Sequence, residues 1–132
     1  DSIEILGDSV ELQQVFIKLF NNAFQAMEGT LDGQLECIIC NTPIKESHQS
    51  IVNRLNSRKI AGICVKDTGM GMAEQVLNRI FEPFFTTKSV GNGTGLGLSV
   101  VHGIIKKHKG ELHVESTLGE GTTFYIYLPA IS

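Results

Sequence analysis

Long apolar runs are absent from this 132-residue sequence. A membrane-spanning helix needs about 20 consecutive apolar residues, and no charged-then-apolar signal segment opens the chain. Excess positive charge is absent too, because 11 Lys and Arg face 14 Asp and Glu, which gives a formal net charge of −3. These absences argue against membrane contact by this part of the chain and against a protein that binds the phosphate backbone of nucleic acids.

Cysteine is scarce, and the three cysteines do not match a metal-site pattern. Cys37 and Cys40 form a CxxC pair without a second pair or a nearby His to complete a zinc site, and Cys64 stands apart. The CxxC pair lies in a run typical of a β-strand, where residues three apart point to opposite faces. We interpret these residues as ordinary strand cysteines and expect burial, because free Cys is usually buried.

Hydrophobic residues make up 42% of the sequence, enough for one compact domain with its own core. No internal repeat, low-complexity tract or linker is visible, so we expect residues 1–132 to form a single domain. The sequence starts at Asp1 without an initiator Met, and we therefore expect it to be a fragment of a longer protein.

A helix is predicted to begin at Asp8-Ser-Val-Glu11, which has the form of a capping box. Apolar residues follow at helical spacing as far as Met27, and the helix should end near Gly29. Its opposite stripe carries Lys18, Asn22 and Gln25.

Asn22 has Lys18 at i−4 and Gln25 at i+3, so these three side chains should share one patch. The carbonyl oxygen of an Asn side chain can bind Mg²⁺. An isolated, exposed Asn on a helix is more often a solvated surface residue, and both interpretations stay open at this point.

Residues 35–42 and 60–66 are rich in residues that favour strands. The polar segment between them, residues 43–59, is long for a hairpin connection, and we interpret it as a mobile loop.

The second half of the chain predicts helices and a hairpin. Residues 72–80 predict a short helix, and a second strong helix follows from about Leu98 to a stop at Gly110. Residues 111–116 and 122–128 alternate apolar and polar side chains, which predicts a closing β-hairpin.

Two glycine clusters flank these elements. Gly93-Thr-Gly95-Leu-Gly97 stands before the second strong helix, where backbone N–H groups can approach a phosphate at the helix N-terminus. Asp67-Thr-Gly69-Met-Gly71 follows a predicted strand, where the carboxylate can accept a hydrogen bond from an exocyclic amine of a flat base. The alternatives are tight turns and close packing for the glycines, and an Asp-x-Gly turn for the second cluster.

Four motifs occur in one order along the chain, and together they resemble the N, G1, F and G2 boxes of sensor histidine kinases. These kinases belong to an ATP-binding superfamily that also includes DNA gyrase, heat-shock chaperones and mismatch-repair ATPases. The matching segments are Asn22-Ala-x-x-Ala26, Asp67-x-Gly-x-Gly71, Phe81-Glu-Pro-Phe84 and Gly93-x-Gly95-x-Gly97. The resemblance covers nearly the whole chain.

The resemblance implies an α+β (α/β) two-layer sandwich. In it, a mixed sheet of about five strands packs against three helices, and ATP lies under a flexible lid at about residues 86–94. It also implies an ATP-dependent protein-histidine kinase domain that uses ATP and Mg²⁺ and lies in the cytoplasm.

The roles of individual residues follow from the same resemblance. Asn22 would hold Mg²⁺, and Asp67 would read the adenine amine. Arg79 would act in the catalytic encounter with the partner domain. The remaining expected contacts to the nucleotide are Gln25, Gly69, Gly71, Lys88, Gly93, Thr94, Gly95, Leu96, Gly97 and Leu98. Of the aromatic residues Phe81, Phe84 and Phe85, we expect at least one to be a core residue.

Lys18 departs from the family pattern. Kinases commonly carry a second Asn at this position, and the ATP-hydrolysing relatives carry a glutamate base. Lys18 therefore argues against hydrolysis by this domain alone, although a lysine there can contact phosphate oxygens. A nucleotide-binding pseudokinase and a superfamily ATPase remain as alternatives.

None of the four histidines lies in a His-Glu helix segment of the kind that family members phosphorylate. These residues are His48, His102, His108 and His113. We therefore expect the acceptor histidine on an upstream dimerisation domain of the same protein. The parent protein should be a homodimer, and a response regulator should receive the phosphate next.

Overall fold

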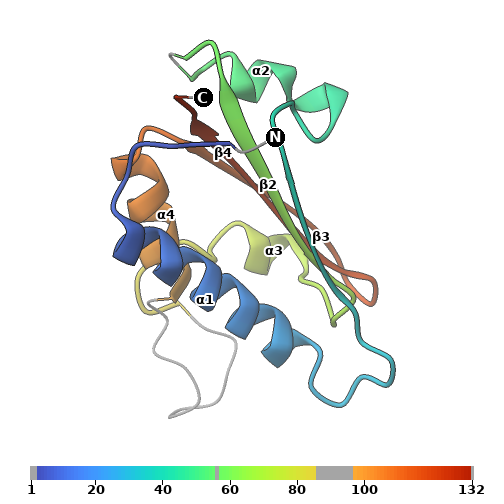
Figure 1. Cartoon of the computed structure of the whole chain (residues 1–132). Coiled ribbons are helices and arrows are strands. Elements are labelled where there is room, and N and C mark those ends of the chain that lie inside the picture. Colours follow the sequence, from blue (N-terminus) through green and yellow to red (C-terminus); the bar gives the residue numbers. More distant parts are fainter. Residues whose placement is uncertain (1–2, 56, 86–96, 132) are drawn as a thin grey trace.

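The computed structural model describes residues 3–55, 57–85 and 97–131. Helices pack against a sheet, as Figure 1 shows. In chain order the elements are α1 (Ser9–Ala26), β1 (Leu35–Cys40), the 3-10 helix η1 (Glu46–His48), α2 (Gln49–Val52), β2 (Ile60–Asp67), α3 (Glu74–Leu77), α4 (Gly97–Lys107), β3 (Glu111–Thr117) and β4 (Gly121–Pro129). The described residues include no helix that is long and apolar enough to span a bilayer.

Helix α1 begins where the sequence predicts. Asp8 is extended, and its Oδ1 accepts a hydrogen bond from the backbone N–H of Glu11 at 3.0 Å. The second half of the capping box differs, because the Asp8 N–H donates to Nε2 of His108 at 3.0 Å. The Glu11 carboxylate instead accepts from the Lys107 ammonium at 2.9 Å. The start of α1 is therefore fixed by the end of α4.

Among the described residues, the sheet has four strands in the order β1-β2-β4-β3, and its three pairings are all antiparallel. The expected mixed sheet of about five strands is corrected in both number and direction. Residues 3–8 form no strand, and the Ile131 N–H donates to the Glu4 carbonyl at 2.7 Å. One backbone bond does not make a ladder, so the N-terminal segment adds neither a fifth strand nor a parallel pair.

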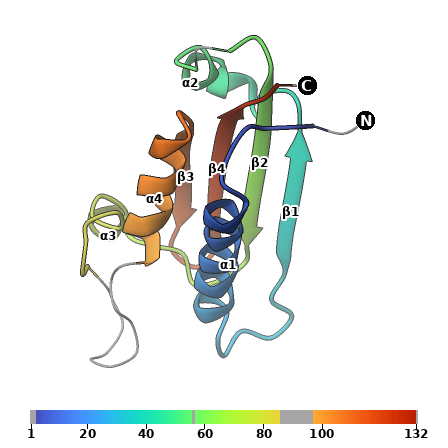
Figure 2. The same cartoon turned by 60° about the vertical axis from the view of Figure 1, so that its left-hand side comes forward.

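The main core lies between one face of the sheet and helices α1 and α4, which Figure 2 shows side by side. Because side chains alternate along a strand, β2 and β4 send every second residue into this layer. The buried members are Val15, Leu19, Ile63, Val65, Ile80, Val101, Ile104, Ile105, Phe124, Ile126 and Leu128. A fully buried side chain of this size contributes roughly 1.5–3 kcal/mol, so this layer fixes the position of both helices.

Helix α2 belongs to a second, smaller core on the opposite face of the sheet. Its buried members are Leu55, Ile60, Cys64, Tyr125 and Tyr127. The interpretation of residues 43–59 as a loop is therefore wrong for residues 46–52, which are helical. The segment contains η1 and α2, and Ile44, Ile51 and Val52 pack against this cluster.

The cysteines are free thiols, but only one follows the expected burial. Cys64 is buried, Cys40 is half-buried and Cys37 is exposed. Cys37 is exposed because β1 is an edge strand of the described sheet, with β2 as its one strand neighbour. The other central residues of β1 are exposed too.

Candidate functional site

The end of α4 packs against the start of α1. Lys107 at the end of α4 pairs with Glu11 near the start of α1 at 2.9 Å. Helix α4 has 11 residues, so at 1.5 Å per residue it is about 16 Å long. The start of α4 therefore lies at the other end of this helix from the Lys107–Glu11 contact.

Asp67 ends strand β2 and faces the helical layer, because it shares the side-chain direction of Ile63 and Val65. Its side chain is buried, at 3% exposure, and Oδ1 accepts a hydrogen bond from the Gly69 N–H at 2.8 Å. Burial raises the pKa of this carboxyl, and the backbone N–H groups of Gly69 and Thr122 oppose that shift. The Asp-x-Gly turn is present, and a carboxylate that makes it keeps lone pairs for a second donor.

The loop after Asp67 is clamped between α1 and the β3–β4 hairpin. A Cβ on Gly69 would lie 2.6 Å from the Ala26 carbonyl oxygen, and the Met70 N–H donates to that same oxygen at 3.0 Å. A Cβ on Gly71 would collide with the Thr117 carbonyl, and Gly71 also has φ of +71°. These glycines are required by close packing and by backbone conformation. The contact at Ala26 holds the loop about one helical turn from Asn22.

The polar stripe of α1 is accessible at this end of the molecule. Lys18 and Asn22 are half-buried, and Gln25 is exposed. Within the described ranges, none of these three side chains makes a hydrogen bond or an ion pair.

Arg79 is exposed, and its guanidinium contacts two neighbouring side chains. Its Nε donates to Oε2 of Glu82 at 3.1 Å, and its guanidinium carbon lies 4.6 Å from the centroid of the Phe85 ring. The sequence reasoning singled out Arg79 but missed Glu82, although an i,i+3 charge pair is a recognisable signal.

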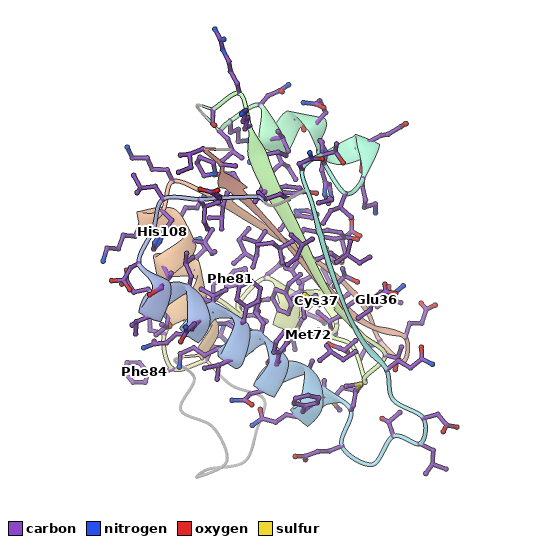
Figure 3. The ribbon with its side chains drawn as sticks, in the orientation of Figure 1. Glu36, Cys37, Met72, Phe81, Phe84 and His108 are labelled. Atoms are coloured by element: carbon purple, nitrogen blue, oxygen red, sulfur yellow. The ribbon has the colours of Figure 1, made fainter. Side chains whose placement is uncertain are left out.

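The aromatic residues of the third motif divide into two groups. Phe81 and Phe85 pack against the main core, which confirms the expectation that at least one is a core residue. Phe84 is 73% exposed with φ of +67°, and Figure 3 shows its ring standing away from the ribbon. A positive φ is unusual for a bulky side chain.

The fourth motif is described only in part. The expected ligands Lys88, Gly93, Thr94, Gly95 and Leu96, and the expected lid at residues 86–94, lie outside the described residues. Gly97 and Leu98 begin α4, where Leu98 packs against the core and Gly97 has open space around its Cα.

The histidines have structural contacts. The ring centroids of His102 on α4 and Phe81 lie 5.3 Å apart. Nε2 of His108 accepts a hydrogen bond from the backbone N–H of Asp8, at the start of α1. His48 and His113 lie together on the opposite face of the sheet, 5.0 Å apart between ring centroids. His48, expected in a loop, is buried in η1.

A cleft of about 450 Å³ lies elsewhere, between residues 41–43 and residues 49–60. It contains none of the expected nucleotide ligands. We do not assign it a role in nucleotide binding.

The fold and these residues define a class of domain: a two-layer α+β module with a buried carboxylate, a polar helical stripe and a helix N-terminus at one end. The family model of histidine kinase-, DNA gyrase B- and HSP90-like ATPases matches residues 7–132. The chain belongs to this family. The resemblance inferred from the four motifs is confirmed, and the domain is an ATP-binding domain of the sensor histidine kinase type.

The relatives are named sensor kinases. The sensor kinase CckA of Brucella abortus (strain 2308) is 43% identical over 128 residues, which is 96% of this chain and 13% of that protein. Sporulation kinase A of Bacillus subtilis (strain 168) is 45% identical over 129 residues, which is 98% of this chain and 18% of that protein. The chain thus spans less than a fifth of the length of these relatives.

Solved structures share the fold. The nucleotide-free catalytic domain of histidine kinase ThkA matches with a TM-score of 0.70 and 28% identity, over 95% of this chain and 70% of that one. Full-length ShkA in complex with AMPPNP matches with a TM-score of 0.67 and 27% identity, over 96% of this chain and 23% of that one.

Proposed function

We propose that this chain is the single catalytic domain of a longer sensor kinase. It binds Mg²⁺-ATP and transfers the γ-phosphoryl group to a histidine on an upstream dimerisation domain. The observation that carries the proposal is the buried Asp67 carboxylate and its loop, which is bonded to α1 through the Met70 N–H and the Ala26 carbonyl, one helical turn after Asn22. This contact brings an acceptor for the adenine amine close to a side chain that can bind Mg²⁺, and a nucleotide requires both groups.

The buried carboxylate suits adenine. Asp67 sits where water is scarce, so an amine that donates to it replaces hydration that burial has removed. Guanine presents a carbonyl at the corresponding position, which would set acceptor against acceptor. Asp67 therefore favours ATP over GTP, with Gly69 and Gly71 letting the loop lie flat beside the base.

The phosphates belong at the start of α4. Backbone N–H groups at a helix N-terminus and the helix dipole favour anions, and Gly97 leaves the approach free of a side chain. Asn22 offers a carbonyl oxygen to Mg²⁺. Lys18, one turn away, offers an ammonium to phosphate oxygens. The donor set fits a magnesium-bound triphosphate, and we assign Gln25, Lys88, Gly93, Thr94, Gly95, Leu96 and Leu98 to the same site.

Transfer needs an acceptor in line with the γ-phosphate and cations that offset the developing charge. A histidine nitrogen of the upstream domain attacks phosphorus, and the bond to the ADP oxygen breaks. Mg²⁺ supplies charge stabilisation when bound. Within this chain, Asn22 and Lys18 orient the phosphates. Arg79 acts in the encounter with the acceptor domain, once its ion pair with Glu82 has broken. A response-regulator aspartate then receives the phosphate. The parent protein is a homodimer, and the reaction takes place in the cytoplasm.

The direct test is calorimetric titration of the chain with ATP, ADP and GTP, with and without Mg²⁺. ATP at about a hundredfold over its dissociation constant should stabilise the fold by roughly 2.7 kcal/mol, seen as a rise in melting temperature. No response to ATP or ADP at millimolar concentration would contradict nucleotide binding.

Phosphotransfer is tested by adding the histidine-bearing domain of the same protein. The expected product is an acid-labile, base-stable phosphoprotein that is lost in Asn22→Ala, because metal placement positions the reacting groups. Nucleotide binding without phosphohistidine would favour the pseudokinase alternative. Steady phosphate release by the chain alone would favour an ATPase, which Lys18 opposes because it cannot serve as a carboxylate base.

A further inference from the structure

A second group of chemically active side chains lies on the sheet face that α1 and α4 do not cover. His113 and Glu115 point the same way because they are two residues apart on β3, and η1 brings His48 over them. One ligand atom from each of the three residues lies within 4.8 Å of the other two. This group plays no part in the nucleotide site described above.

His48 carries an unexplained polar atom. The residue is 2% exposed, and its Nε2 is the one buried side-chain nitrogen or oxygen without a hydrogen-bond partner among the described residues. A buried polar atom without a partner costs about 1–3 kcal/mol, so its retention calls for an explanation. The atom faces Glu115, whose Oε2 lies 3.9 Å away.

The opposite nitrogen of His48 is firmly held. Nδ1 lies 2.6 Å from the hydroxyl oxygen of Tyr127, and the backbone N–H of Ile44 donates to that same oxygen at 3.2 Å. Histidines that bind metals usually have the second ring nitrogen fixed by such a partner, which orients the ring. The Tyr127 hydroxyl therefore aims Nε2 of His48 at the gap between His113 and Glu115.

The other two ligands are arranged around the same point. Nε2 of His113 lies 3.7 Å from Oε2 of Glu115, so one carboxylate oxygen faces both imidazoles. Both side chains are about 42% exposed, which leaves a path for an ion to enter. Ligand atoms around a tetrahedral zinc ion stand about 3.3 Å apart, so modest rotations of these exposed side chains close the site.

The burial of His48 also suits a neutral imidazole. Burial lowers the pKa of His48, and Glu115 opposes the shift. A neutral imidazole is the form that binds metal. Lys45 is the competing cation, because its Nζ donates to Oε1 and Oε2 of Glu115 at 3.0 and 3.1 Å.

We propose that His48, His113 and Glu115 form a binding site for a divalent transition-metal ion, with Zn²⁺ as the preferred ion. Two imidazoles and one carboxylate suit Zn²⁺ and disfavour Mg²⁺, which prefers oxygen ligands. The site is therefore chemically distinct from the proposed magnesium site at Asn22. A bound ion would tether η1 to β3 and would satisfy the orphaned nitrogen of His48.

The experiment is calorimetric titration of the chelator-treated 132-residue chain with ZnCl₂, in the absence of nucleotide. We expect one ion per chain and a rise in melting temperature. His113→Ala and Glu115→Gln should each weaken Zn²⁺ binding by roughly tenfold or more, since loss of even an outer partner of a metal ligand costs 10- to 100-fold. These variants are preferred to His48→Ala because both residues are half-exposed, whereas His48 is buried against Tyr127.

Two controls separate this site from adventitious binding. His102→Ala removes an imidazole on α4 and should leave Zn²⁺ affinity unchanged, and so should the double variant Cys37→Ser/Cys40→Ser. Co²⁺ bound at the site should give the visible bands of a tetrahedral complex without a thiolate charge-transfer band. Absence of binding, equal affinity in His113→Ala, or loss of binding in the cysteine double variant would overturn the proposal.

Lys45→Gln supplies the sharpest check. The ammonium and the metal ion compete for one carboxylate, so removing the ammonium should tighten Zn²⁺ binding. An unchanged or weaker affinity would contradict the placement of the ion at Glu115. None of these outcomes depends on ATP binding, so failure here is distinguishable from failure of the kinase function.

Discussion

Asp67 is the residue on which base recognition depends. Asp67→Asn keeps an oxygen that can accept from the Gly69 N–H, so the turn survives, but it sets an amide donor against the adenine amine. We expect ATP affinity to fall by about 1–3 kcal/mol, while affinity for GTP changes less. Calorimetry with both nucleotides measures this. Equal losses for ATP and GTP would contradict the assignment of the base.

The pKa of Asp67 makes a separate prediction for the protein without nucleotide. Burial raises this pKa above the ordinary value, so the folded state binds the proton more tightly than the unfolded state. The stabilising contribution of the protonated carboxyl is therefore complete below the unfolded pKa, about 3.9, and is lost as pH rises through the folded pKa.

Asp67→Asn should then unfold at a higher denaturant concentration than the wild type at pH 7, with the difference closing in strongly acid solution. Denaturant unfolding at several pH values checks the sign. A variant that is less stable than the wild type at pH 7 would show that the hydrogen bonds from Gly69 and Thr122 outweigh burial. Gain of stability with loss of ATP affinity is the pattern expected of a binding residue.

At the scale of elements, the loop between β2 and α3 depends on glycines for two separable reasons. Gly71 has φ of +71° and a Cβ there would collide with the Thr117 carbonyl, whereas Gly29 has φ of +76° with nothing within 4 Å. Gly29→Ala should lower the free energy of unfolding by roughly 1–2 kcal/mol, the cost of a positive φ for a residue with a side chain. Gly71→Ala should lower it clearly more, because the clash adds to that cost. Urea unfolding of the two variants compares them directly, and equal losses would contradict the clamp.

The main elements were predictable because their signals are local. The capping box of Asp8 and Glu11, the apolar periodicity of α1 and the alternation in the closing hairpin each involve residues close in sequence. The extra cap from His108 was not predictable, since its partner lies 100 positions away and only tertiary packing brings them together.

The candidate site was predictable in its motifs and not in its assembly. Glycines and an aspartate at the end of a strand indicated a nucleotide, but the packing of α4 against α1 depends on the Lys107–Glu11 contact and the shared core. The helical part of residues 43–59 was missed because the polar composition concealed three apolar side chains that pack against the second core. The alternation of His113 and Glu115 was a usable signal that the sequence reasoning did not follow.

At the scale of the whole molecule, Lys18 decides what the domain can do with ATP. Its ammonium has no partner among the described residues and lies one helical turn from Asn22. If it contacts phosphate oxygens, Lys18→Asn should weaken ATP binding and slow phosphotransfer to the upstream domain. We expect this outcome, because no other group of the described chain neutralises the ammonium.

The measurement is phosphohistidine formation at saturating and limiting ATP, which separates binding from transfer. Lys66→Asn is a matched control, because Lys66 is an exposed lysine at the far side of the sheet layer from this stripe. A faster Lys18→Asn enzyme would contradict the phosphate contact and show that the lysine is a handicap.

The packing around Gly69 and Gly71 requires glycine at both positions for folding, whether or not the domain binds nucleotide. Random mutagenesis scored only for folded protein should already reject most side chains at these two positions, since the Ala26 and Thr117 carbonyls leave no space for them. Purifying selection for folding would preserve both glycines in a lineage that had ceased to bind nucleotide. Asp67→Asn, which we expect folding to tolerate, would therefore record the loss of activity long before the glycines did.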